Sequence, residues 1–280
     1  MVRIIADTLA CLEQEIADQY QIPVIPQVIN FGEESYFEGT EMSIQDFMAR
    51  LKTNMVMPKT SAPSPELFAK EFERLGRDGE TILCIMPTAE LSGTVRSAEV
   101  ARLDFPNADI RVIDTRTLGS PLGTFVKLAA QWAAEGESAD TIQNRIASLI
   151  PRCHIYFLVA SLDFLARGGR IGGASALLGS LLQVKPILQV IDGRIDVLEK
   201  ERTYKKAYQR LIELTTQQIA PDGKGYLTVM HADVPEQGAA LARELAGLTH
   251  QSTVNLYDVP PAIVTHAGPG ILGTAFFEPL

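Results

Sequence analysis

Short apolar runs rich in β-branched residues alternate with amphipathic segments through the first half of the chain, and this alternation constrains the fold more than any other feature. The expected strands are residues 2–5, 24–30, 81–86, 109–113 and 156–160, and helical patterns lie near 43–52, 65–76, 94–103, 119–135 and 138–149. Such an alternation predicts a mostly parallel sheet flanked by helices. Ligands of these folds bind at the carboxyl ends of the strands, next to helix N-termini.

The second half of the chain has a different pattern. Two apolar runs, residues 186–191 and 194–198, flank the dipeptide Asp192-Gly193, which is a strong signal for a two-residue β-hairpin. Further along, helical patterns at 202–219 and 235–246 alternate with strand patterns at 226–230 and 253–257. The sequence therefore predicts an α/β protein made of two α/β domains, residues 1–160 and 161–280.

Composition narrows the range of partners. The formal net charge of −9 and the lack of a basic cluster argue against nucleic acid, which cationic side chains must bind. We find no stretch of eighteen apolar residues and no signal-peptide pattern, so we expect no integral membrane segment and a cytoplasmic location. The three cysteines, Cys11, Cys84 and Cys153, form no CxxC pair, so neither a metal site nor a disulfide framework is expected.

Two polar segments of the first half are candidate ligand contacts. Residues 58–66 read PKTSAPSPE, where Ser64 with the following proline and acid predicts a helix start, and Thr60 and Ser61 would lie in front of that helix. An ordinary polar loop is the alternative interpretation.

The second segment follows the expected strand 81–86 and reads LSGT at residues 91–94. Ser92 can cap a helix that begins at Thr94, and Gly93 lets a ligand approach the backbone. Exposed N–H groups and the helix dipole make this start a natural anion site. The anion can be a carboxylate or a phosphate, and plain capping is the alternative.

Residues 165–173, LARGGRIGG, combine four glycines with two arginines. A special backbone path is one interpretation, and a flexible loop between domains is the other. Arg170 could bind a phosphate or an acidic partner in this segment.

Residues 265–273, THAGPGILG, contain the G-x-G-x-x-G spacing of dinucleotide-binding loops, beginning at Gly268. That interpretation is rejected, because only seven residues follow Gly273 and residues 274–277 have a strand pattern, whereas the motif needs a following helix and a distant acid. His266 can donate to a carboxylate and ordinarily titrates near neutrality.

The recognised catalytic signatures are missing from the sequence. There is no G-x-S-x-G, no H-E-x-x-H and no G-x-x-x-x-G-K-[ST]. The chain therefore has hydroxyls and a histidine without recognised activation machinery, and the sequence gives little support for a nucleotide kinase activity within it.

These segments together resemble the DegV family in the family's order along the chain. The matching stretches are Asp7-Thr8, residues 59–65 (KTSAPSP), residues 91–98 (LSGTVRSA), residues 162–188 and residues 266–270 (HAGPG). The resemblance implies two α/β domains with a fatty acid between them, and no cofactor besides this ligand. It also implies that a separate fatty acid kinase phosphorylates the acid for phospholipid synthesis.

The resemblance implies a set of contacts for this chain. The groups around the carboxylate would be Thr60, Ser61, Ser92, Gly93 and His266. Their neighbours complete the expected ligand-binding set: Thr94, Gly119, Ser120 and Gly268. Arg170 is the expected partner-binding residue. Pro121 stands where the family usually has glycine, so we expect it to narrow the acyl tunnel or alter its mouth.

Physical chemistry supports neutral donors around such a ligand. A carboxylate removed from water must be compensated by hydrogen bonds, or it protonates. Burying sixteen carbons would contribute on the order of 10 kcal/mol before association costs. Two alternatives remain: a hydrolase or acyl transferase that uses Ser92 with His266, and a lipid-sensing regulatory protein.

Overall fold

The computed structural model describes residues 1–53, 56–76, 79–178, 184–219 and 225–279 of the 280-residue chain. The chain divides into two compact units, Met1–Pro151 and Arg152–Leu280. Each unit has its own β-structure and its own apolar core.

A four-stranded parallel sheet organises the first unit, with strand order β2-β1-β6-β7. Its strands are β1 (Val2–Asp7), β2 (Val24–Ile25), β6 (Thr81–Met86) and β7 (Ile110–Asp114). The helices of this unit are α1 (Gln14–Tyr20), α2 (Ile44–Thr53), α3 (Pro65–Leu75), α4 (Thr94–Arg102), α5 (Ser120–Ala134) and α6 (Ala139–Leu149). The predicted mostly parallel sheet flanked by helices is confirmed.

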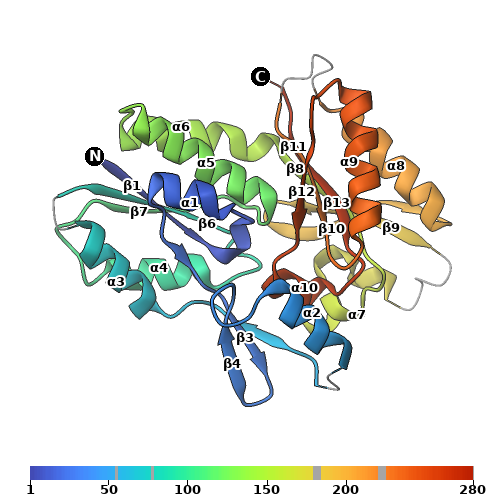
Figure 1. Cartoon of the computed structure of the whole chain (residues 1–280), viewed down its shortest axis with the longest axis horizontal. Helices are drawn as coiled ribbons and strands as arrows, with labels where there is room; N and C mark the ends of the chain where they lie inside the picture. Colours follow the sequence, from blue (N-terminus) through green and yellow to red (C-terminus); the bar gives the residue numbers. More distant parts are fainter. Residues whose placement is uncertain (54–55, 77–78, 179–183, 220–224, 280) are drawn as a thin grey trace. The chain divides into compact units, whose positions relative to one another are not determined.

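Alternate residues of β6 explain the packing of this sheet. Ile82, Cys84 and Met86 join one apolar core with Phe68 and Phe72 of α3. Because successive side chains of a strand point to opposite faces, the remaining residues of β6 point to the other face, where α5 contacts β1 and β6. Figure 1 shows α3 and α4 on one face of the sheet, with α5 on the other.

A small antiparallel sheet with order β4-β3-β5 was not predicted. Its strands are β3 (Val28–Phe31), β4 (Glu34–Phe37) and β5 (Lys59–Ser61). The single strand expected over residues 24–30 is divided at Pro26, which has no N–H for a strand ladder. As a result β2 belongs to the parallel sheet and β3 to the small one.

The second unit contains a six-stranded sheet of order β10-β9-β8-β13-β11-β12. Its strands are β8 (Cys153–Leu158), β9 (Lys185–Ile191), β10 (Arg194–Glu201), β11 (Leu227–His231), β12 (Asn255–Asp258) and β13 (Leu272–Phe277). Its helices are α7 (Asp163–Arg167), α8 (Tyr204–Thr216), α9 (Pro235–Thr249) and α10 (Pro261–Ala267). Helices α8 and α9 pack on one face, around Leu211, Leu245 and Phe276.

The structure refines two expectations about the second unit. The hairpin of β9 and β10 is confirmed, and Asp192 and Gly193 have φ angles of 49° and 79°. The division between units falls after Pro151, whereas a boundary at residue 160 was expected. The reason is that β8 pairs antiparallel with β9 and β13, and therefore belongs to the second sheet.

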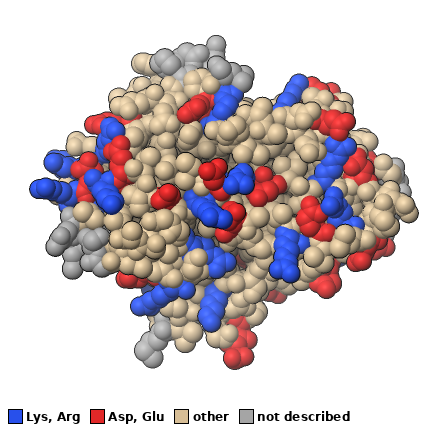
Figure 2. All heavy atoms as spheres, turned by 180° about the vertical axis from the view of Figure 1, so that it is seen from behind, with Lys and Arg blue, Asp and Glu red and all other residues tan. Residues whose placement is uncertain are grey.

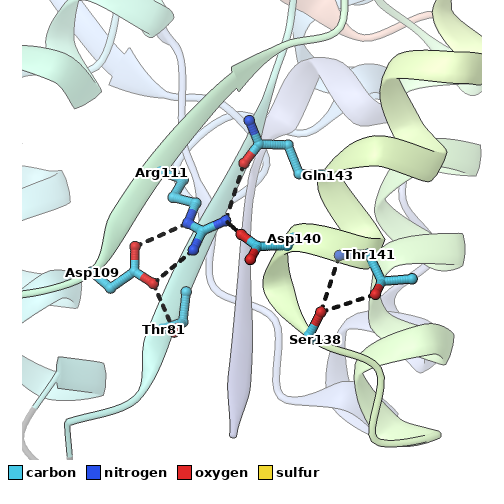
Figure 3. Close-up of polar contacts among 7 residues, drawn as sticks. All are labelled: Thr81, Asp109, Arg111, Ser138, Asp140, Thr141 and Gln143. Atoms are coloured by element: carbon cyan, nitrogen blue, oxygen red, sulfur yellow. Dashed lines mark hydrogen bonds and ion pairs between the residues drawn. The ribbon is translucent and has the colours of Figure 1, made fainter.

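Surface charges of the first unit are paired locally. Figure 3 shows Arg111 of β7 bound to Asp109 and to Asp140 of α6, at 2.9 and 2.5 Å, with Gln143 as a further acceptor at 3.3 Å. Ion pairs within helices, such as Arg74–Glu71 and Arg102–Glu99, follow the same pattern. On the face shown in Figure 2, side chains of both signs are intermixed.

Candidate functional site

The carboxyl ends of β1, β6 and β7 bring together most of the residues that the sequence singled out in the first unit. The connections that follow these strands are joined by backbone hydrogen bonds. Gly119 N–H donates to Leu9 O at 2.8 Å, and Thr88 N–H donates to Thr117 O at 2.8 Å. This edge of the parallel sheet is where ligands of such folds bind.

Helix α4 begins at this edge with two hydroxyl groups in contact. The Ser92 and Thr94 side-chain oxygens lie 2.8 Å apart, and the Thr94 N–H donates to Ser92 Oγ at 3.3 Å. The expected helix start at Thr94 is confirmed, with Gly93 as the residue before it. A Cβ atom on Gly93 would lie 3.1 Å from Cβ of Ala62, so the segment after β5 packs directly against this helix start.

Thr60 and Ser61 lie in β5, where they pair with Ile29 and Val28 of β3. Ser61 is exposed, and its hydroxyl accepts a hydrogen bond from the Asn30 amide at 3.1 Å. The structure thus places both residues directly before Ala62, the residue that packs against Gly93 at the start of α4.

Ser64 occupies the predicted N-cap position of α3, and Pro65 begins the helix. The Ser64 hydroxyl makes no capping bond to the backbone. It hydrogen-bonds instead to Glu66, and this bond lowers the pKa of the Glu66 carboxyl.

Gly119 and Ser120 form the start of α5, next to the β1 end. Gly119 has a φ of 71°, a conformation that favours glycine, and Ser120 is buried at 3% exposure. Pro121 is also buried in the first turn, where its missing N–H costs no helix bond. Its expected effect on an acyl tunnel stays a prediction.

A buried polar network behind Ser92 was missed by the sequence analysis as a functional feature. Asp7, Gln27 and Thr94 are exposed by 0%, 3% and 0%. The Gln27 amide donates to Asp7 Oδ2 at 2.8 Å and to Thr94 Oγ1 at 2.7 Å. On the far side, the Gln27 N–H donates to the Thr8 hydroxyl, which donates to the buried Glu38. The position of Asp7 at the end of an apolar strand was the one available signal.

Burial gives the Asp7 carboxyl unusual acid–base behaviour. It raises the pKa of Asp7 from 3.8 to about 7, and the negative charge of Glu38 acts in the same direction. Hydrogen bonds from Gln27, Thr94 and the Leu9 N–H oppose this rise. The group therefore titrates near neutral pH.

In the second unit the two glycine-rich motifs meet through α7 and α10. A Cβ on Gly168 would lie 2.3 Å from His266 Nδ1, and one on Gly268 would lie 2.6 Å from the Phe164 ring. Gly268 also has a φ of 80°. Only glycine allows this close packing, so packing explains why residues 168 and 268 are glycine better than a flexible loop does.

The charge state of His266 differs from its ordinary behaviour. Burial, together with the positive charge of Arg170, lowers the pKa of His266 to about 4, and a hydrogen bond with the Gly168 backbone opposes both effects. The imidazole is therefore neutral at pH 7, whereas the sequence suggested titration near neutrality.

Arg170 is half-buried, and its Nη1 donates to Gly168 O at 2.7 Å. It therefore supports the backbone next to His266. The exposed arginine of this segment is Arg167, in the last turn of α7.

Three further observations bear on the kind of site. In the described part of the chain, no cluster of three His, Cys, Asp or Glu side chains is arranged to hold a metal ion. Among the same residues, no helix combines the length and the apolar character needed to cross a membrane. A cavity of about 210 Å³ at the amino end of β1, between Tyr20 and Ala134, lies at the opposite end of that strand from Asp7.

Solved structures of similar proteins share this fold over nearly the whole chain. A structure described as showing fatty acid binding of a DegV family protein from Thermus thermophilus has a TM-score of 0.92 and 28% identity, with 99% of both chains covered. A DegV protein from Bacillus subtilis, described as a fatty acid binding protein, has a TM-score of 0.91 and 31% identity, again over 99% of both chains.

Sequence relatives agree with the structural match. A DegV domain-containing protein from Halalkalibacterium halodurans is 34% identical over 277 residues, covering 99% of this chain and 98% of the relative. The sequence profile of the family described as "uncharacterised protein, DegV family" matches residues 1–279. With that match extending over both units, this chain is a member of the DegV family.

Proposed function

We propose that this chain binds a long-chain fatty acid in an apolar tunnel and presents its carboxylate to a separate kinase, which forms an acyl phosphate. The observation that carries the proposal is the partly exposed Ser92 hydroxyl at the start of α4, held 2.8 Å from the buried hydroxyl of Thr94. Ser92 offers a neutral donor at the carboxyl edge of a parallel sheet, near the Thr60–Ser61 segment. The fatty-acid-binding relatives in the family support this choice of ligand.

Neutral donors fit a carboxylate that must later be released to an enzyme. The neutral imidazole of His266 can donate one hydrogen bond, and the Ser92 hydroxyl and the Gly93 N–H can donate others. The expectation that both sets meet the same carboxylate comes from the family resemblance, and it stays a prediction that the variants below test.

The direct test of the ligand is denaturing mass spectrometry of lipid extracted from the purified protein. A co-purifying long-chain fatty acid is the expected result, and it would also give the acyl length and unsaturation. Protein that carries no lipid and fails to take up added palmitate would contradict the proposal.

Ser92→Ala should weaken palmitate binding by about ten- to one-hundredfold, because a hydrogen bond to a charged group contributes about 1.5–3 kcal/mol. His266→Ala should have a similar effect. Titration calorimetry measures both, with Ser97→Ala, a serine of α4 further from the helix start, as the matched control. In the double variant, losses that fall short of the sum would show that the two groups share one carboxylate, whereas additive losses would argue against a shared contact.

Arg170→Ala should reduce association with the fatty acid kinase, and Arg167→Ala is the matched control from the same segment. Loss of the Arg170 charge should also raise the pKa of His266, which NMR of the imidazole measures directly. Pull-down of the kinase tests the partner role. Wild-type kinase binding by the Arg170 variant would contradict that role, even if the histidine pKa moves as expected.

A hydrolase or acyl transferase using Ser92 and His266 is disfavoured by electrostatics. A general base must accept a proton, yet burial and the Arg170 charge both disfavour the imidazolium form of His266. Turnover of ester or acyl-phosphate substrates by the purified chain alone would restore that alternative. Association with a partner other than a kinase would favour a lipid-sensing role instead.

A further inference from the structure

Four side chains of the first unit form a continuous hydrogen-bonded path from a buried acid to the start of α4. The Gln27 amide bridges Asp7 Oδ2 and Thr94 Oγ1, at 2.8 and 2.7 Å. Thr94 is also a direct hydrogen-bond partner of the Asp7 carboxyl. From Thr94 the path continues 2.8 Å to Ser92 Oγ. The first three members are buried, while Ser92 is partly exposed.

The number of hydrogen atoms available along this path determines which of its groups donate and which accept. Both N–H groups of the Gln27 amide are used on Asp7 and Thr94, so Thr94 always accepts one bond from Gln27. The Thr94 oxygen has one further lone pair and one hydrogen for its two remaining partners, Asp7 and Ser92. It must therefore donate to one of them and accept from the other.

The charge of Asp7 decides between the two arrangements. An ionised carboxylate only accepts, so Thr94 donates to Asp7 and accepts from Ser92, and the Ser92 hydrogen points into the protein. A protonated Asp7 donates to Thr94, which then donates to Ser92. The Ser92 hydroxyl accepts this bond together with the one from the Thr94 N–H, and its own hydrogen is left to point outward.

We propose that Asp7 is a positioning residue that switches the direction of the Ser92 hydroxyl, so that Ser92 can donate to an anionic ligand when Asp7 is protonated. The proposal rests on the proposed function in one respect, namely that a carboxylate is the ligand of Ser92. It adds a regulatory property to that function: affinity for the carboxylate falls as the pH rises through the titration of Asp7.

The surroundings of Asp7 suit this role. The charged group that acts on the carboxyl is the acid Glu38, while Gln27 from the β2–β3 connection and Thr94 from α4 are neutral. Elsewhere on this sheet edge, Asp114 accepts from the Arg116 N–H at 2.8 Å, separately from the path. Burial with a neighbouring acid keeps the protonated form accessible at neutral pH, and the pKa of about 7 agrees with the geometry.

The test is the pH profile of palmitate affinity for the full chain between pH 6 and pH 8. If only the protonated form donates from Ser92, affinity should fall by up to about tenfold over this range, in proportion to the protonated fraction. Asp7→Asn removes the titrating group and should flatten the profile. Thr94→Val breaks the path and should also flatten it, whereas Thr94→Ser keeps a hydroxyl and should restore the slope.

A measurement without ligand separates this proposal from the proposed function. The side-chain amide of Gln27 touches Asp7, so its NMR shifts should titrate near pH 7 in the wild type and stay constant in Asp7→Asn. If the Gln27 shifts change with pH near 7 but the protein binds no palmitate, the proposed function is overturned and, with it, the link to a carboxylate. Palmitate binding with parallel pH profiles for wild type, Asp7→Asn and Thr94→Val would overturn the switch alone.

Discussion

Asp7→Asn should be more stable relative to wild type at pH 8 than at pH 4, by on the order of 4 kcal/mol in the free energy of unfolding of the first unit. This magnitude follows from a pKa of Asp7 of about 7 in the folded chain and 3.8 when exposed. At a pH between these two pKa values, Asp7 has lost its proton in the unfolded chain and retains it in the folded chain. Folding then binds a proton, so the wild-type free energy of unfolding falls as the pH rises from about 4 to about 7, and it is flat above. Asparagine does not titrate, so the variant lacks this loss.

The measurement is urea unfolding at several pH values, with the fluorescence of Trp132 as the probe of the transition. This is the only tryptophan of the chain and lies in α5, so it reports on the first unit. Asp114→Asn, which replaces a partly exposed acid at the end of the neighbouring strand β7, is the matched control. A constant difference in unfolding free energy between Asp7→Asn and wild type at all pH values would contradict a raised pKa of Asp7.

Phe276→Ala should destabilise the second unit by about 3–5 kcal/mol, the usual cost of removing a buried phenylalanine ring. Phe276 has 0% exposure in the middle of the six-stranded sheet. Its ring stacks on His154 at 5.2 Å and meets the edge of Tyr156 at 5.3 Å, so its loss removes one ring contact from each partner.

Hydrogen exchange of peptides from β8, β11 and β13 measures this loss within the second unit. Leu248→Ala removes an apolar side chain that is 54% exposed in the same unit and should change little. Equal effects of the two substitutions would show that the ring is not a core residue. The Asp7 and Phe276 predictions therefore probe the two units by separate signals.

The local elements of this fold were predictable because their signals are local. The β-branched runs and helical periodicity predicted β1, β6 and β7 and helices α2 to α6, although not α1, and Asp192-Gly193 predicted the hairpin. Sequence could not show that β8 pairs antiparallel with β13, since those strands are over a hundred residues apart. The small sheet was missed for a related reason: Pro26 moves the chain from one sheet to another, and only tertiary pairing shows where β3 goes.

The candidate site was predictable as a set of motifs but not as a network. Ser92, Gly93 and Thr94 were found because a helix start after a strand is visible in the sequence. The burial of Asp7 with Gln27 depends on residues brought from three separate segments, and no local pattern joins them. Likewise, the low pKa of His266 arises first from burial and then from the charge of Arg170, almost a hundred residues earlier in the chain.

The place of β13 in the second sheet has a consequence for synthesis on the ribosome. This strand comes last of the described strands in sequence, yet it lies between β8 and β11 and joins the two halves of the sheet. Until residues 272–277 have emerged from the exit tunnel, β8 and β11 each present an unpaired edge, which is a template for aggregation. The nascent second unit should therefore complete its fold late, and depend on chaperones until that strand arrives.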